Sequence, residues 1–597
     1  MPEMLSPGTY VQEIDGSQIT PSVSNSTCAF AGNFNLGTVG ALTLNTSVSD
    51  LISNHGYPDD NNFNDWFQAW NFLQYGNKLL ISRAVNETED GTGTINGVIE
   101  VGDETSTEIF TVNGEDIELD REYTIYKAPV EIEADHIENN MFIGNSSDYD
   151  NKELSIAFTN PAKSKLKIMS RNPGVWAEDL EICIVKPDSF YANSPFPEDH
   201  INKYAFEGIL VDDLYEFAPS GTEFGIIIRY KSQIVEIYTV DTVKTAKDTN
   251  KRTTYVENVI NTKSSYIFAK DNTGLDTVAD TTLFYDVLSN EYVGQSLKLL
   301  HSATTSIQKD DIIEASSLFE NKEELEIDIV IGNELDGGKS AKYVSAQRKD
   351  SISFIGANYE SCVGVKSSVA ALNLIEWRMK GDVSSDSMFS AVFGNYKYQY
   401  DTYNDVYRWV NLAGDIAGLR AQTTMNRASW WASAGLERGK IKNVTKFAFN
   451  PTQPMRDLLY KNSINPCVVF PGMGAVCWGQ KTLYSKPSSF DRVNVRGLFN
   501  SLERSLSKMA KYQVMEFNDT FTRNRIISMI KPYLAGVQAG RGIQDFLVIC
   551  DESNNTPQVI ASNQLIVDIY IKPTYVAEFI LLKFTNAGTN SFSSIVS

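Results

Sequence analysis

The segment GNELDGGKS, residues 332–340, is where residue types and spacing come nearest to a chemical site. It follows the apolar run Ile327–Ile331 and precedes a predicted helix, as a phosphate-binding P-loop does. A P-loop needs GxxxxGK[ST], so that the loop wraps the phosphate and places its lysine. Gly332 lies one residue too far from Gly338, and Asn333 occupies the required position. We therefore predict a glycine-rich turn before a helix.

Other motifs for catalysis or metal binding are absent from the sequence. GxSxG, HExxH and the EF-hand pattern do not occur, and the six cysteines form neither a CxxC pair nor a Cys/His cluster. The four histidines are isolated: His55, His136, His200 and His301. We predict no enzyme, no catalytic residue, no metal and no cofactor. A degenerate hydrolase or nucleotidase on the βαβ unit around residues 327–356 is the alternative, and nucleotide binding would favour it.

The segment NYKYQYDTYNDVYRW alternates Tyr396, Tyr398 and Tyr400. Such spacing could form a stacking platform for carbohydrate or bases. Over so short a span it more often marks one packed face of a strand, which is our prediction. A receptor-binding or adhesion protein that uses this segment stays open as a less favoured class.

Charge is distributed unevenly along this chain of 597 residues, whose formal net charge is −23. That charge disfavours binding to nucleic acid or to anionic membranes. From Asp491 to Asp545, however, nine Lys and Arg residues stand against five Asp and Glu. Four of the nine lie near one face of a predicted amphipathic helix: Arg496, Arg504, Lys508 and Lys511. They form either an ordinary solvated face or an interaction surface.

Length and patterning indicate several folded domains of mixed α/β and α+β class. We expect folding in a cytosol without membrane insertion, because no apolar run could span a bilayer and no signal-peptide pattern begins the chain. The predicted units are an N-terminal arm (1–20), a first αβ part (21–88), an acidic, β-rich, exposed insertion (89–165), a β-rich middle region (166–310), a βαβ unit (311–372), a C-terminal domain (373–585) and a C-terminal arm (586–597).

Long stretches of the sequence resemble the tail sheath proteins of contractile-tailed bacteriophages. They include SPGTYVQEID and GNKLLISRAV near the start, then GDIAGLRAQTTMNRASWWASAGLERGKI, RVNVRGLFNSLERSLSKMAKYQVMEFNDTFTRNRI and GRGIQDFLVICDESNNTPQVIASNQLIVDIYIKP. The resemblance covers about residues 21–88, 170–270 and 320–597. The stretch from about 89 to 165 has no counterpart in it.

The resemblance implies a structural subunit that forms hexameric rings, stacked helically around a tail tube, whose contraction drives the tube through the host envelope. It implies a sheath domain of subtilisin-like topology without an active site, and an inner C-terminal domain. The implied partners are other copies of the chain, the tail tube protein, and the baseplate and tail terminator proteins. The implied location is the phage tail in the virion, after assembly in the host cytoplasm. A related contractile injection system, such as a tailocin or a secretion-type sheath, is the alternative.

The resemblance also suggests roles for the two arms and for the basic helix face. In this family the arms add strands to the C-terminal domains of neighbouring subunits, which is β-augmentation. The arm residues so assigned are Tyr10, Val11, Gln12, Glu13, Ile14, Phe592, Ile595 and Val596. The basic residues Arg496, Arg504, Lys508 and Lys511 would face acidic groups of the tube or of neighbouring subunits through weak, releasable ion pairs.

Overall fold

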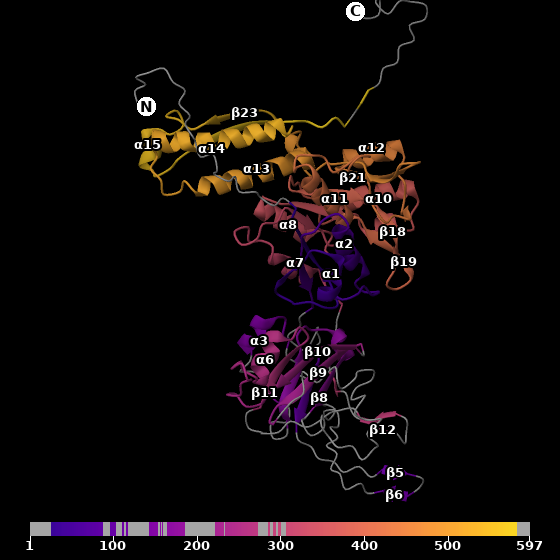
Figure 1. Ribbon diagram of the computed structural model, residues 1–597. Coiled ribbons are helices and arrows are strands. Elements are labelled where there is room, and N and C mark those ends of the chain that lie inside the picture. Colours follow the sequence, from indigo (N-terminus) through magenta and orange to yellow (C-terminus); the bar gives the residue numbers. More distant parts are fainter. Residues whose placement is uncertain are drawn as a thin grey trace, which may run out of the picture.

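The computed structural model describes residues 26–86, 96–102, 110–112, 115–117, 142–152, 156, 158, 164–185, 221–231, 233–272, 284–286, 291–293, 297–299, 306–578 and 580–581. These residues form two lobes (Figure 1). The upper lobe holds a large sheet and the C-terminal third of the chain, and the lower lobe consists mainly of strands. The predicted arms, 1–20 and 586–597, lie outside the described residues, together with all eight residues assigned to their strands.

An eight-stranded sheet forms the centre of the upper lobe. Its strands, in spatial order, are β2 (Leu42–Asn45), β3 (Leu79–Ala84), β1 (Cys28–Asn33), β15 (Ile329–Ile331), β16 (Ile352–Gly356), β17 (Ser390–Gly394), β21 (Ile464–Phe470) and β22 (Gly474–Cys477). Strands β3 to β21 run parallel, and β2 and β22 are antiparallel to their neighbours. The first strand is therefore central: Cys28 pairs with Leu79 on one side and with Ile329 on the other.

Helices cover both faces of this sheet, as the apolar character of its parallel strands requires. Alternate residues of the strands, such as Phe30 and Phe354, pack with α2 (Phe63–Leu73) and α11 (Ala413–Asn426). On the opposite face, Ala29 and Val330 pack with α7 (Lys309–Ser317) and α8 (Lys339–Arg348). Further helices are α1 (Val48–His55), α9 (Tyr359–Cys362), α10 (Ser367–Lys380) and α12 (Gln453–Lys461). The predicted βαβ unit is confirmed as β15, α8 and β16.

Two packed sheets form the lower lobe. One contains β10 (Gln233–Val240), β9 (Phe224–Tyr230), β8 (Leu180–Val185) and β14 (Leu297–Lys298), and the other β11 (Ile267–Asp271), β7 (Ser164–Ser170) and β4 (Val98–Gly102). Their apolar side chains share one core with α6 (Val256–Lys263). The remaining elements are α3 (Ser146–Lys152), β5 (Phe110–Val112), β6 (Glu115–Ile117), β12 (Phe284–Asp286) and β13 (Glu291–Val293).

The sheets correct two of the predicted boundaries. Strand β4 belongs to the predicted insertion 89–165, yet it pairs with β7 of the middle region. Strands β17, β21 and β22 lie beyond residue 372 and still extend the large sheet. Residues 165 and 372 are therefore not boundaries, because backbone hydrogen bonds join the segments on either side of each.

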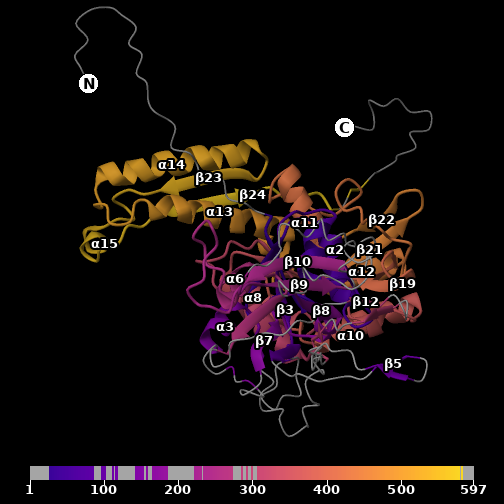
Figure 2. The same ribbon diagram turned by 60° about the horizontal axis from the view of Figure 1, so that its bottom comes forward.

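The end of the described chain forms a flat extension, which we call the C-terminal layer (residues 493–573). It contains α13 (Val493–Lys511), α14 (Thr520–Ala539), β23 (Ile543–Ile549), α15 (Pro557–Ala561) and β24 (Asp568–Pro573). Figure 2 shows its two long helices and two strands side by side, to one side of the large sheet. The predicted amphipathic helix is confirmed as α13, and the Asp519 side chain caps α14 by accepting a hydrogen bond from the N–H of Thr522.

The tyrosine-rich segment is a strand, as predicted. It forms β18 (Tyr396–Asp401), which pairs with β19 (Val406–Asn411) and with β20 (Lys446–Phe447). Tyr396 is buried, and the Tyr398 ring stacks on Tyr407 and packs against Trp409. This packing within the hairpin supports the interpretation of a packed strand face.

Candidate functional site

The C-terminal layer ends in a small sheet whose outer edges are open within the described chain. β23 and β24 pair only with each other there, as a two-stranded antiparallel sheet. The inner side chains, among them Val548 and Ile569, pack on α13 and α14. On the outer face the cross-strand pair Leu547 and Tyr570 is 55% and 59% exposed. Open strand edges carry unpaired backbone N–H and C=O groups, so this sheet is suited to gaining further strands.

The chain leaves the C-terminal layer from a fixed point at Glu578. This carboxylate accepts hydrogen bonds from the Arg492 guanidinium (2.7 and 3.0 Å), the Tyr460 hydroxyl (3.0 Å) and the Gln480 amide (3.2 Å). Just beyond it, Ile580 and Leu581 are almost fully exposed. The sequence did not single out this anchor, because its four residues lie far apart along the chain.

The turn between α13 and α14, which we call the tip (residues 512–521), exposes a group of large apolar side chains. They are Tyr512, Val514, Met515, Phe517 and Phe521, with exposed fractions between 64% and 97%. Exposed apolar groups of this size mark contact surfaces. The sequence signal was YQVMEF, an apolar run between two helices that fits neither helical nor strand periodicity.

Arg496 and Arg504 do not lie on a solvated basic face. Arg496 is 4% exposed, donates to Asn500 (2.6 Å) and Glu503 (2.8 Å), and lies over the Phe389 ring. Arg504 crosses from α13 to the sheet, where its guanidinium binds carboxylates and backbone carbonyls at the start of β15 and β16. Their assignment to a tube-facing or neighbour-facing stripe is wrong for the free subunit, because both charges are already paired inside the chain.

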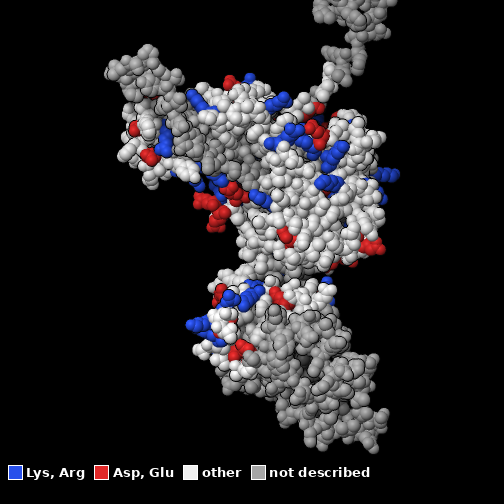
Figure 3. All heavy atoms as spheres, in the orientation of Figure 1, with Lys and Arg blue, Asp and Glu red and all other residues white. Residues whose placement is uncertain are grey.

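The other two residues of the predicted stripe remain closer to solvent. Lys508 is partly exposed and forms an ion pair with Glu326, whereas Lys511 is exposed. On the face shown in Figure 3, basic and acidic side chains are interspersed over the upper lobe, including the C-terminal layer. A contact between these two lysines and a partner stays a prediction.

The glycine-rich turn places a carboxylate where a P-loop would hold phosphate. The Asp336 side chain accepts hydrogen bonds from the N–H groups of Gly338 (2.8 Å) and Ser340 (2.7 Å) at the start of α8. These are the donors that an anion would use at a helix N-terminus. Asn333 donates to the Ala31 carbonyl and to Asp65, so it fastens the loop to β1 and α2. The prediction of a structural turn agrees with this arrangement.

Burial in the same region perturbs an acidic group. Asp65 on α2 accepts hydrogen bonds from the Asn33 N–H (2.8 Å) and the Asn333 amide (2.8 Å). Burial nevertheless raises the pKa of its carboxyl to about 7. Within the described ranges no group of His, Cys, Asp and Glu could hold a metal ion, and none of the described helices is apolar and long enough to cross a membrane.

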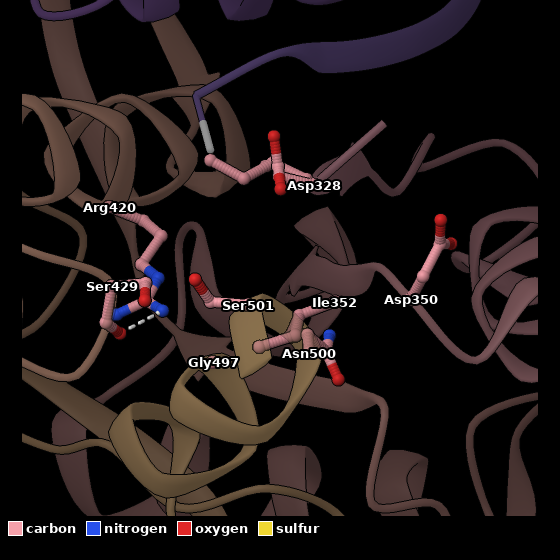
Figure 4. Close-up of a pocket in the computed structure, with 9 residues that line it drawn as sticks. Asp328, Asp350, Ile352, Arg420, Ser429, Gly497, Asn500 and Ser501 are labelled. Atoms are coloured by element: carbon pink, nitrogen blue, oxygen red, sulfur yellow. Dashed lines mark hydrogen bonds between the residues drawn. The ribbon is translucent and has the colours of Figure 1, made fainter. Parts of the chain in front are cut away.

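A small polar pocket marks the junction between the large sheet and α13 (Figure 4). Arg420 of α11 reaches into it and donates to the Ser429 carbonyl, beside Gly497 of α13. A Cβ atom on Gly497 would lie 1.7 Å from the Arg420 guanidinium, so only glycine fits there. At the sheet side the Asp328 side chain is 13% exposed, and desolvation raises the pKa of its carboxyl to about 6 although Arg504 lowers it. The junction is a buried charge network with no substrate-sized cavity.

Comparisons with known proteins find relatives of this chain. The family described as "Phage tail sheath protein central domain" matches residues 319–483, and "Phage tail sheath C-terminal domain" matches residues 485–585. The "Tail sheath protein" of Enterobacteria phage T4 is 29% identical over 98% of this chain and 98% of its own length. That of Vibrio phage KVP40 is 29% identical over 99% of this chain and 100% of its own length. A solved sheath tail protein from Desulfitobacterium hafniense is 9% identical, covers 91% of this chain and 94% of that one, and aligns with a TM-score of 0.49.

The multidomain α/β fold carries two surfaces suited to contacts with other chains, the open-edged sheet and the exposed tip. Residues 319–483 and 485–585 match the two phage tail sheath domains, and over nearly its whole length the chain is similar to phage tail sheath proteins, which are structural proteins.

Proposed function

We propose that the chain polymerises into hexameric rings, stacked helically around a tail tube, and that contraction of this sheath drives the tube through the host envelope. The observation that carries the proposal is the two-stranded β23–β24 sheet with its open edges. The six parallel strands with helices on both faces support the finer, subtilisin-like topology of the sheath domain. The proposal places the chain in the virion, after assembly in the host cytoplasm, with the baseplate and tail terminator proteins at its ends.

In this proposal each arm pairs with a neighbour's β23–β24 sheet. An arm strand such as Tyr10–Ile14 would form about five backbone hydrogen bonds, each contributing about 0.5–1.5 kcal/mol net. One arm therefore links two subunits only weakly. A closed lattice makes each further contact effectively intramolecular, so that many weak links hold the sheath together. Tyr10, Gln12 and Ile14 would point to one face of the sheet, and Val11 and Glu13 to the other.

The C-terminal arm leaves from the anchored Glu578, which fixes where it can reach. The four side chains at this point hold the root of the arm against α12 and the start of α13. The exposed Ile580 and Leu581 then lie at the beginning of the segment that crosses to a neighbour. Phe592, Ile595 and Val596 would supply its strand.

The tip supports a releasable contact with the tail tube. Its five exposed apolar side chains and the nearby Lys511 offer a surface that the buried Arg496 and Arg504 do not. We assign the energy of contraction to contacts between subunits that form only in the contracted state. No nucleotide is needed, in agreement with the Asp336 carboxylate at the start of α8.

Negative-stain electron microscopy of the purified chain tests the proposal. We compare the full-length chain with a chain lacking residues 1–18 and with one in which Tyr10–Ile14 is replaced by five Gly and Ser residues. The second variant keeps the length of the arm and removes its strand propensity. We expect tubes or stacked rings from the full-length chain, alone or with tube protein as template, and compact monomers from both variants. Equal assembly by all three chains, or none by the full-length chain with tube protein present, would refute it.

A further inference from the structure

Two cysteines face each other in the hairpin at the edge of the large sheet. Cys467 of β21 lies directly opposite Cys477 of β22. The Cys477 N–H donates to the Gly439 carbonyl (2.8 Å), and the Cys477 carbonyl accepts from the Gly435 N–H (2.9 Å). Since Cys477 sends both backbone groups away from Cys467, the two form a non-hydrogen-bonded pair, whose Cα atoms lie about 4.5 Å apart. Disulfides bridge Cα separations of about 4.4–6.8 Å.

The two side chains also lie on the same face of the hairpin, because residues directly opposite each other on antiparallel strands do. The Cys477 sulfur donates to the Gly479 carbonyl (3.5 Å). Both side chains belong to the core beneath the sheet, and all six cysteines of the chain are free and buried. Closing a bond between these two sulfurs therefore requires no change of strand register.

We propose that Cys467 and Cys477 are a modification site, at which a peroxide oxidises the two thiols to a cross-strand disulfide. The sulfur of one cysteine attacks a peroxide oxygen, the O–O bond breaks, and a sulfenic acid and water form. The second sulfur then attacks the first, the S–S bond forms, and the S–O bond breaks with loss of a second water. Overall, two thiols and one hydrogen peroxide give one disulfide and two waters.

Burial makes this reaction slow and conditional. The neighbouring Cys477 thiol, together with burial, raises the pKa of the Cys467 thiol, so the reactive thiolate is scarce in the closed hairpin. Residues 471–474 at the turn are exposed, and β22 is the outermost strand of the sheet, so local opening starts there. A reducing cytosol keeps the pair as thiols, and an oxidising medium outside the cell allows the bond.

The bond would restrain the strand that leads to the root of the C-terminal arm. Gln480 follows Cys477 by three residues, and its amide donates to Glu578. Opening of β22 therefore pulls on one of the groups that hold this carboxylate. The disulfide ties β22 to β21 and keeps that group in place.

Peptide mapping of the full-length chain tests the proposal, because trypsin releases both cysteines in one peptide, residues 462–481. Reduced, folded protein is treated with hydrogen peroxide, unfolded in iodoacetamide and digested. We expect the two cysteines of this peptide to lose two hydrogen atoms and to carry no alkyl group, while Met473, which is 52% exposed, gains oxygen independently. The two cysteines should take up two alkyl groups when dithiothreitol precedes alkylation. Cys183 and Cys362 are buried on other elements and should remain alkylatable.

Two controls make the outcome decisive. Oxidation of Met515, which is 97% exposed, shows that peroxide was sufficient. The variants Cys467→Ala and Cys477→Ala each keep one thiol and should give no peptide lighter by two hydrogen atoms. If Met515 is oxidised while the wild-type peptide still takes up two alkyl groups, or if either cysteine is linked to another cysteine, the proposal is overturned.

Discussion

Arg504 joins the C-terminal layer to the large sheet, and its removal should loosen that junction strongly. Its guanidinium pairs with the Asp328 carboxylate, lies 3.5 Å from a carboxylate oxygen of Asp350, and donates to the carbonyls of Ile327 (2.9 Å) and Asp350 (3.0 Å). The side chain is only 7% exposed. Removing one partner of such a buried pair costs about 3–5 kcal/mol, because the other charge stays buried without it. We predict this loss for Arg504→Met.

Hydrogen exchange followed by mass spectrometry measures the effect locally, which suits a chain with several cores. Each 1.4 kcal/mol is a factor of ten, so amides of α13 and β15 should exchange roughly 10² to 4 × 10³ times faster in Arg504→Met. Lys511→Met is the matched control on the same helix. Since Lys511 is exposed, it should change the opening free energy by no more than about 0.5 kcal/mol.

A double variant tests whether the pair itself is responsible. Asp328→Asn keeps a hydrogen-bond acceptor but removes the charge. The double variant Asp328→Asn/Arg504→Met should therefore lose less stability than the two single variants together, by at least about 1 kcal/mol. The loss from Arg504→Met should also shrink as the pH falls from 8 to 5, because the stranded Asp328 then becomes neutral. Additive losses, or a loss below about 1 kcal/mol for Arg504→Met, would refute the reasoning.

Further predictions concern single groups in the upper lobe. The folded-state pKa of Asp65 is about 7 and its ordinary value is 3.8, so this group lowers the free energy of unfolding by up to about 1.4 kcal/mol per pH unit as the pH rises from 4 to 7. Thermal melts of Asp65→Asn should lack this pH dependence of stability. An unchanged pH dependence contradicts the assignment. In chemical denaturation, Gly414→Ala should lower the free energy of unfolding by more than about 3 kcal/mol, because its Cβ would lie 2.1 Å from the Gln68 carbonyl oxygen. Gly536→Ala has open space around it and should raise the free energy of unfolding by about 0.5–1 kcal/mol. Asp336→Ala should lower the opening free energy of α8, measured by hydrogen exchange, by about 1 kcal/mol. Calorimetric titration of this variant with ATP should still show no binding. Binding would reopen the nucleotide interpretation.

Local patterns in the sequence predicted helices and strands well where the spacing of apolar residues matches one type of element. The amphipathic pattern around Arg496 to Lys511 predicted α13, and the alternating tyrosines predicted β18. The glycine-rich turn could be assigned because one displaced glycine breaks the P-loop spacing. Each of these inferences depends on residues close together in the chain.

Long-range pairing is what the sequence did not disclose. Arg504 pairs with carboxylates that precede β15 and β16, and Arg496 lies over the Phe389 ring, which is more than 100 residues away along the chain. Helical spacing predicts which residues lie together on α13 but not what covers them. The point where the chain leaves the C-terminal layer shows the same limit, because Glu578 is held there by side chains from three distant places.

The central position of β1 has a consequence for how the chain is made. Cys28–Asn33 emerges from the ribosome early, but its second neighbour, β15, begins at Ile329. At about 5–20 residues per second, one flank of β1 waits roughly 15–60 s for its partner. Until then an apolar strand with free backbone groups is exposed at the margin of a half-built sheet. Synthesis of this chain therefore passes through a long aggregation-prone interval, and its yield should depend on translation speed and chaperone supply more than on the stability of the finished fold.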